Sequence, residues 1–164
     1  MVSPELKIQK SARHAKITGN FGEAVILYWL SKYGFECALV DHTGIDIIAR
    51  NPYTQERMGI SVKSRSRNRG KEEEHVSIAN DNFEKAEGAC SAFGCIPYFA
   101  IVVDAGDTIQ GFLLPMKHLL ELFPRGKTAS GWKMRKSDLE KYRQDSEIRR
   151  FVFTTKTFNW WEQA

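Results

Sequence analysis

The sequence has no long hydrophobic run, since its longest uninterrupted apolar stretch covers only residues 24–30. A helix that crosses a bilayer needs about 20 apolar residues, so we expect no membrane partner. The first residues are polar and lack the apolar centre of a secretory signal. Together these two absences predict a cytoplasmic protein.

Cysteine is scarce, and several catalytic motifs are absent. Cys37, Cys90 and Cys95 are odd in number and lack the spacing of zinc ligands, which argues against a disulfide framework and a structural zinc site. The chain contains no dinucleotide-binding fingerprint, P-loop or nucleophile elbow. What remains is an ordinary globular composition, with 42% hydrophobic and 27% charged residues among 164. The net charge of +4 is small, so its position matters more than its size.

Helix signals occur at both ends of the chain and in its middle. A basic stripe at three-residue spacing predicts a first helix over 5–17, made of Lys7, Lys10, Arg13 and Lys16. A break at Thr18-Gly19 is followed by a capping pattern, Asn20 to Glu23, and a helix to about Tyr33 whose apolar middle predicts burial on every side. Further helices are expected over 80–93, over 115–123, and after a second capping pattern, Ser137 to Glu140.

Short apolar segments between turn residues predict the strands. They cover residues 35–40, 45–50, 57–63, 98–104, 108–114 and 150–161. The resulting order, α-βββ-α-β with a further strand, predicts an α/β (α+β) fold in which helices flank a mixed central sheet. We expect a single domain over 1–164, with a core at about 20–103 and a carboxyl-terminal extension at about 104–164.

Two acids and a lysine occupy positions where local structure does not require them. Asp46 lies between apolar residues of one strand, and Lys63 ends the next strand. If the two strands pair, Asp46 and Lys63 approach each other, and Glu23 lies on the helix just upstream. Two carboxylates can share a divalent metal, and a nearby lysine can bind a water and offset charge on a phosphate.

These residues resemble a known family. The series Gly22-Glu23, Gly44-x-Asp46 and Ser61-Val62-Lys63 resembles the PD-(D/E)XK nucleases, the restriction-endonuclease-like superfamily, and is nearest the small archaeal and bacterial branch with the Holliday junction resolvases. The resemblance extends from about Asn20 to Val103 and includes the order of elements.

The resemblance implies a site and its partners. It makes Glu23, Asp46 and the backbone carbonyl of Val62 ligands of Mg²⁺ or Mn²⁺, and Lys63 the lysine that assists the attacking water. It implies DNA as the partner, with RNA left open, and a homodimer as a possible assembly. The sequence departs from the family at Ser61, where an acid is usual. Glu84, Glu87 or one of Glu72 to Glu74 could replace that acid.

Simpler interpretations stay open for the same residues. Glu23 could be a helix cap, Asp46 could have a structural role, and Lys63 could form a salt bridge with Asp46. His42 reads as a turn residue. His14, His75 and His118 have no partner spacing, so we expect them on the surface or in the core.

Positive charge concentrates beside the candidate site. Between 57 and 71 there are six bases and no acid, and the last five recur at every second position, which suits an extended segment that follows phosphates. They are Lys63, Arg65, Arg67, Arg69 and Lys71. Arg13 and Lys16 could form a second wall. The alternative is a solvated loop with charges that promote solubility.

The sequence therefore leads to two main hypotheses. The first is a metal-dependent endonuclease that hydrolyses phosphodiester bonds of DNA. The alternative is a catalytically inactive DNA-binding module with the nuclease fold, or a subunit of a larger DNA-processing complex, for which Trp132, Trp160 and Trp161 offer aromatic contact surface.

Overall fold

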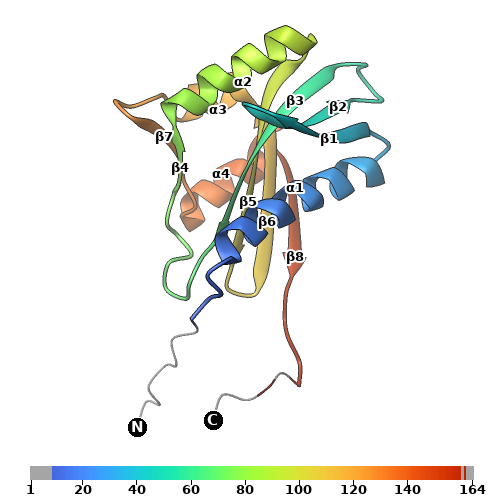
Figure 1. Ribbon diagram of the computed structural model, residues 1–164. Coiled ribbons are helices and arrows are strands. Elements are labelled where there is room, and N and C mark those ends of the chain that lie inside the picture. Colours follow the sequence, from blue (N-terminus) through green and yellow to red (C-terminus); the bar gives the residue numbers. More distant parts are fainter. Residues whose placement is uncertain (1–8, 160, 162–164) are drawn as a thin grey trace.

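The fold is a six-stranded sheet with helices on both faces. The computed structural model describes residues 9–159 and 161 (Figure 1); Lys7 and Trp160, both named above, lie outside this part. Along the chain the elements are α1 (His14–Lys32), β1 (Glu36–His42), β2 (Ile45–Arg50), β3 (Arg57–Ser66), β4 (Val76–Ala79), α2 (Asn80–Phe93), β5 (Ile96–Ala105), β6 (Thr108–Pro115), α3 (Met116–Leu122), β7 (Ala129–Trp132), α4 (Lys136–Gln144) and β8 (Arg149–Thr154).

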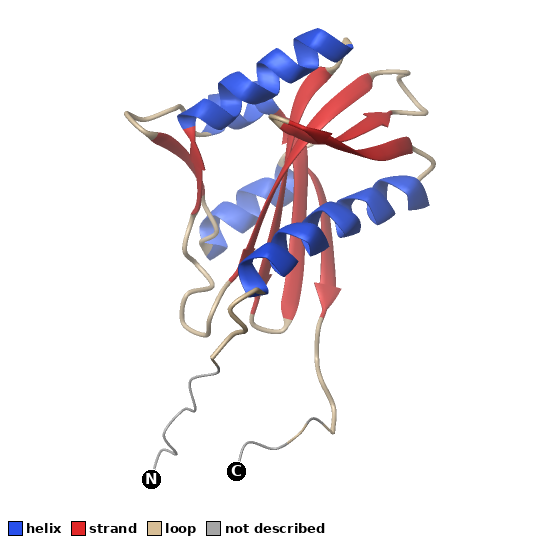
Figure 2. Cartoon of the chain, in the orientation of Figure 1, coloured by secondary structure: helices blue, strands red, loops and turns tan. Residues whose placement is uncertain are grey.

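The main sheet is mixed. Its strand order is β1-β2-β3-β5-β6-β8, and β4 and β7 form a separate two-stranded ribbon. β3 and β5 are parallel, with α2 in the connection between them, and the other neighbouring strands are antiparallel. The prediction of an α/β fold with a mixed central sheet flanked by helices is confirmed (Figure 2).

Two apolar layers separate the sheet from its helices. On one face α1 contributes Val25, Ile26 and Leu30 to a cluster with Ala100 and Val102 of β5. On the other face β5 turns Phe99, Ile101 and Val103 toward α2, α3 and α4. Because β5 is buried on both faces, its sequence is a continuous apolar run rather than an alternating one.

The amino-terminal helix differs from the prediction. α1 is one helix from His14 to Lys32, so Gly19 and Asn20 lie inside it and Asn20 is not a cap. Gly22 permits this packing, since a Cβ there would lie 1.6 Å from Ser64 Oγ and 2.8 Å from Ser64 Cβ on β3. Tertiary packing against β3 thus carries the helix through a local break signal.

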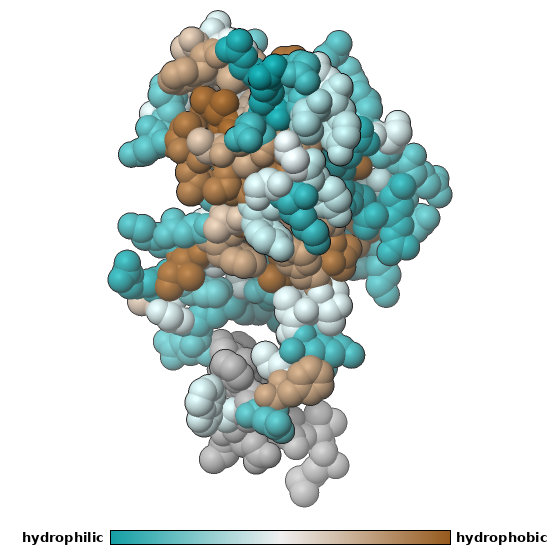
Figure 3. Space-filling view, turned by 90° about the vertical axis from the view of Figure 1, so that its right-hand side faces the viewer, coloured by the Kyte–Doolittle hydropathy of each residue, from teal (hydrophilic) through white to brown (hydrophobic). Residues whose placement is uncertain are grey.

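The prediction that the apolar part of this helix is buried on every side is also wrong. Within residues 24–30, Ala24 is exposed and Tyr28 is 61% exposed. Figure 3 shows such apolar patches interrupting the hydrophilic surface on one side of the molecule.

Other differences lie outside the sheet centre. β4 and β7 pair as an antiparallel ribbon, from Val76 opposite Trp132 to Ala79 opposite Ala129. This ribbon was not predicted. The capping box of α4 is made by Arg135 and Asp138 rather than by Ser137 and Glu140. The last strand ends at Thr154 instead of reaching residue 161. All three cysteines are free thiols, as expected. None of the helices within the described ranges is long and apolar enough to cross a membrane.

Candidate functional site

The candidate site lies where β2 stops pairing with β3. The two strands pair from Arg50↔Arg57 to Ile47↔Ile60. Beyond this point β3 continues, and Asp46 Oδ2 accepts a hydrogen bond from the Val62 backbone N–H at 2.7 Å. The carboxylate therefore takes the place of a strand carbonyl. Since the N–H and C=O of one strand residue point to the same side, the Val62 carbonyl is also directed to the Asp46 side.

The turn before β2 fixes the position of Asp46. Gly44 has φ +103°, and a Cβ at this position would lie 2.3 Å from the Lys85 carbonyl oxygen of α2. Only glycine combines this backbone angle with so close an approach. The β1–β2 turn is thereby held against α2, and Asp46 follows two residues later.

Glu23 approaches Asp46 from α1. The adjacent Gly22 brings the helix close to β3, and Glu23 is half-buried. The pKa of Glu23 is raised, first by burial and then by the charge of Asp46 and a hydrogen bond with its carboxyl group. Glu23 lies in the middle of α1 rather than in its first turn, so the helix-cap interpretation is wrong. The two carboxyl groups are neighbours.

Lys63 lies on the α2 side of the same strand. Its Nζ donates a hydrogen bond to Asn82 Oδ1 at 2.6 Å. Burial lowers the pKa of Lys63, while the charges of Asp46 and Asp81 oppose this and those of Arg65 and Lys85 add to it. Asp46 thus acts on Lys63 through space. Among the described residues these two side chains form no direct salt bridge, so that interpretation is wrong.

Asn82 was missed by the sequence analysis. The polar triplet 80–82 was interpreted only as the start of a helix, although it is the part of α2 that faces Lys63. These polar residues are visible in the sequence, but polar residues are also common at the start of a helix, so they do not indicate a contact with Lys63.

The acids proposed to replace the one missing at Ser61 have other partners or are exposed. Ser61 is 3% exposed. Glu84 binds Arg125 at 3.0 Å, Glu74 pairs with Arg67 and Lys71, and Glu72 accepts from the Gly70 N–H at 3.0 Å. Glu73 and Glu87 are exposed.

The basic segment does not form the single extended row that was expected. β3 ends at Ser66, and residues 67–75 form a loop. Arg65 donates to the Ser77 carbonyl of β4 at 3.3 Å, and Arg67 donates to the His75 carbonyl at 2.9 Å. These arginines connect β3 to the segment of β4. Arg69 and Lys71, with Arg13 and Lys16 of the first helix, are exposed.

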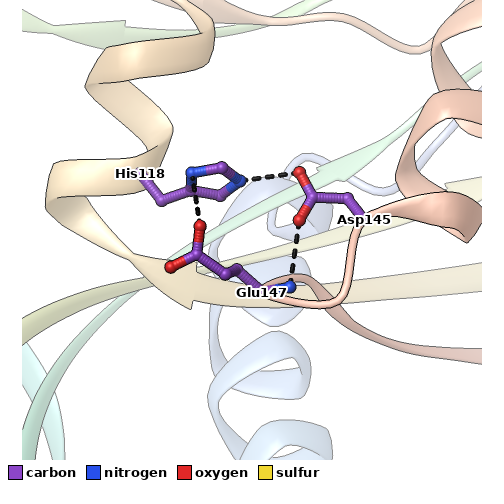
Figure 4. Close-up of side chains that lie close together, drawn as sticks. All are labelled: His118, Asp145 and Glu147. Atoms are coloured by element: carbon purple, nitrogen blue, oxygen red, sulfur yellow. Dashed lines mark hydrogen bonds and ion pairs between the residues drawn. The ribbon is translucent and has the colours of Figure 1, made fainter.

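A second cluster of ionisable groups joins α3 to the end of α4 (Figure 4). His118 Nε2 lies 2.6 Å from Asp145 Oδ2, and its Nδ1 lies 3.0 Å from Glu147 Oε2 and 3.4 Å from Glu121 Oε2. Burial alone would lower the pKa of His118, but hydrogen bonds to Asp145 and Glu121 and the charges of Asp145 and Glu147 outweigh it, so the pKa is raised. His118 shows no partner spacing in the sequence because its partner Asp145 lies 27 residues away.

One ligand atom each from His118, Asp145 and Glu147 lie within 4.8 Å of one another, which is close enough for a metal. However, the carboxylates occupy opposite nitrogens of one ring, and a doubly protonated imidazole satisfies both contacts. The cluster needs no cation.

The two other histidines expected on the surface or in the core have defined positions. His14 is half-buried in the first turn of α1, and His75 is exposed. His42, expected in a turn, ends β1, where its Nδ1 lies 2.9 Å from the Thr43 carbonyl oxygen and its ring packs edge-on against Phe93.

Comparisons with known proteins identify the fold. No protein-family model matches the chain, and no curated protein matches it either. Among solved structures, it is similar to Hjc, a Holliday junction resolvase from the archaeal hyperthermophile Archaeoglobus fulgidus, with a TM-score of 0.54 and 21% identity over 75% of this chain and 93% of that chain. At this identity the similarity concerns architecture, and the mixed sheet with its flanking helices is a resolvase-like, restriction-endonuclease-like fold.

Proposed function

We propose that the protein is a metal-dependent endonuclease of the PD-(D/E)XK superfamily that hydrolyses DNA. The observation that carries the proposal is the juxtaposition of the Glu23 and Asp46 carboxyl groups beside the Val62 backbone. Two neighbouring carboxylates repel each other unless a proton or a cation lies between them. The fold similarity to a junction resolvase supports the same class of chemistry.

The donor set fits a hard divalent cation. Glu23, Asp46 and the Val62 carbonyl offer oxygen atoms, which Mg²⁺ and Mn²⁺ prefer. When bound, such an ion supplies Lewis-acid stabilisation of the charge that develops on the phosphate. Asp46 already accepts the Val62 N–H with one oxygen, and this hydrogen bond orients the carboxyl group for a ligand on its other oxygen.

Lys63 is the residue that we assign to the attacking water. An ammonium group has three donors, and Asn82 takes one of them. The other two remain for a water and a phosphate oxygen. In the in-line reaction the water oxygen forms a bond to phosphorus while the bond to the leaving oxygen breaks, and the proton lost by the water balances the one gained by the leaving alcohol. Asn82 is a positioning residue, because it fixes Nζ.

Nicking of supercoiled plasmid DNA in Mg²⁺ or Mn²⁺ tests the proposal. We expect Asp46→Asn and Lys63→Met each to slow cleavage by about a thousandfold, comparable to the loss of a transition-state contact. Asp145→Asn, in the His118 cluster, is the matched control and retains activity. A four-way junction belongs among the substrates, because the structural neighbour is a junction resolvase. Cleavage that survives both site substitutions would refute the proposal.

An inactive DNA-binding module is the second candidate, and Ser61 favours it. The described structure has a buried hydroxyl where the family carries an acid, and the α2 side chain that binds Lys63, Asn82, is neutral. This candidate predicts DNA binding without metal and without cleavage. Tight Mg²⁺ or Mn²⁺ binding that Asp46→Asn abolishes would count against it.

The assembly that we propose is a homodimer. Exposed apolar residues of α1 recur at i, i+4, i+7 and i+11, namely Ile17, Phe21, Ala24 and Tyr28. Such a stripe is typical of helix-to-helix contact. Light scattering coupled to size-exclusion chromatography distinguishes a dimer from a monomer.

A further inference from the structure

A groove of about 530 Å³ opens between the amino end of α1 and the second half of β3. One wall comes from residues 10–18, and the other comes from Ser64, Arg65 and Ser66. The groove follows the same α1–β3 seam as the candidate metal centre, since Gly22, the neighbour of Glu23, packs on Ser64. The inference below rests on the proposed function and extends it.

Two polar atoms in the walls of the groove have no partner. Ser64 Oγ and His14 Nε2 are buried and form no hydrogen bond within the part of the chain that the structure describes. A buried polar atom without a partner costs about 1–3 kcal/mol. Both residues line the groove, although the two atoms themselves are covered.

The groove favours an anion. Lys10 Nζ donates to Ser66 O at 2.9 Å and to Ser66 Oγ at 3.0 Å, which holds the ammonium group at one wall. α1 has no acidic residue in its first turn and no side-chain cap, so the positive end of its dipole is not neutralised. No acid lines the groove. The nearest acid with a described contact is Asp104, which accepts from Ser66 Oγ at 2.9 Å.

The distance to the candidate centre matches a polynucleotide. Ser64 and Ser66 lie two and four residues beyond Val62 on β3, or about 7 and 13 Å along the strand. One strand of B-form DNA advances about 3.4 Å per nucleotide. We infer that this groove binds a backbone phosphate of the DNA about two to four nucleotides from the bond that is cleaved. Lys10 contacts that phosphate.

Binding measured without cleavage tests the inference. In EDTA and in an Asp46→Asn background, fluorescence anisotropy follows a labelled duplex over a range of salt concentrations. Losing one phosphate contact lowers the slope of log K against log salt by about 0.9. We expect this change for Lys10→Gln, with about tenfold weaker binding at low salt. Lys141→Gln is the matched control, because Lys141 is exposed on α4, which packs on the opposite face of the sheet.

Replacing single phosphates identifies the ligand. A neutral methylphosphonate, moved along one strand, should weaken wild-type binding at one position and have no further effect on Lys10→Gln. Inorganic phosphate alone should bind only weakly, as judged by the shifts of the Ala15 and Lys16 amides in NMR spectra. Strong binding of inorganic phosphate without any methylphosphonate effect would assign the groove to a free anion and overturn the inference.

The outcomes separate this inference from the proposed nuclease function. An unchanged salt slope in Lys10→Gln, with the protein folded, overturns the phosphate site even if the wild-type protein cleaves DNA. A lowered slope supports the site even if no cleavage is detected. Thermal unfolding of each variant excludes loss of fold as the cause.

Discussion

The two clusters of ionisable side chains in this protein differ in how their charges are balanced. In the His118 cluster, each ring nitrogen lies against a carboxylate, at 2.6 Å and 3.0 Å. In the candidate metal centre, Glu23 and Asp46 approach each other, and the nearest base, Lys63, is hydrogen-bonded to Asn82. The charges of the first cluster are balanced, whereas in the second two carboxyl groups lie together.

Proximity of potential ligands is therefore a poor guide to function. The His118 cluster satisfies a distance criterion for a metal, yet its groups already stabilise one another. The centre at Asp46 holds like charges together, which is unfavourable without a ligand. Unbalanced charge at a defined position is the stronger functional signal.

The largest expected difference between the clusters is their response to metal. A ligand that binds only the folded state stabilises it by about 2.7 kcal/mol at one hundred times its dissociation constant. Thermal unfolding of the wild-type protein should therefore shift upward in Mg²⁺ or Mn²⁺. Asp46→Asn should lose the shift, and Asp145→Asn should keep it. If only Asp145→Asn loses the metal-induced shift in thermal unfolding, the metal binds in the His118 cluster and the proposed centre at Asp46 is refuted.

A second test displaces Glu23 without changing its chemistry. In Gly22→Ala the new Cβ meets Ser64 Oγ and Cβ, so α1 must move away from β3, at a cost of about 1–3 kcal/mol. Metal binding should weaken along with stability in chemical denaturation.

Two variants control for this effect. Gly19→Ala, with nothing within 4 Å of its Cβ, should stabilise the helix by about 0.5–1 kcal/mol. Ser64→Gly should restore part of the loss when combined with Gly22→Ala. If Gly22→Ala changes neither stability nor metal binding, the close approach of α1 to β3 at Gly22 does not position the site.

Local sequence patterns predicted the elements that surround the site. The strands at 45–50 and 57–63 and the helix at 80–93 follow from apolar runs bounded by turn residues, and the structure extends the second strand only to Ser66. Asp46 stood out because a charge between apolar strand residues is costly without a function or a partner. These features depend on neighbours in the sequence.

Features that depend on distant residues were not predictable. β4 and β7 are four-residue strands whose pairing joins Val76 to Trp132, and neither carries a local signal. The break expected at Gly19 disappears because Gly22 packs on Ser64, which lies 42 positions further along. Likewise, only the fold shows that Asn82 holds Lys63. Long-range packing decides these positions, and local sequence patterns do not reveal it.

A third test concerns the repulsion in the candidate centre. The raised pKa of Glu23 means that the folded state holds the proton more tightly than the unfolded state. This contribution to stability is present below the ordinary pKa of 4.5 and is lost as the pH rises through the raised value. At pH 7 the ionised Glu23 therefore opposes folding.

Glu23→Gln should consequently stabilise the metal-free protein at pH 7, by about 0.5 kcal/mol because solvent screens a partly exposed pair. The gain should disappear below pH 4.5. Urea unfolding at pH 7 and pH 4 measures both values, and Mg²⁺ should stabilise the wild-type protein more than the variant. A loss of stability at pH 7 would indicate that Glu23 has a structural role instead.

The last prediction concerns the His118 cluster, where stability should depend on charge in the opposite way. Its raised pKa stabilises the folded state below the ordinary value of 6.5, and this stability is lost as the pH rises through the raised value. His118→Gln should therefore lose about 1 kcal/mol at pH 5.5 and less at pH 8.5, as measured by urea unfolding. Lys141→Gln on the exposed face of α4 controls for nonspecific charge effects. Because the imidazolium is already paired with Asp145 and Glu147, divalent metal should not change the loss of stability in His118→Gln at either pH. At Glu23, by contrast, metal should make the wild-type protein more stable than Glu23→Gln. A metal-dependent gain that disappears in His118→Gln would make this cluster a ligand site and remove the distinction between the two regions.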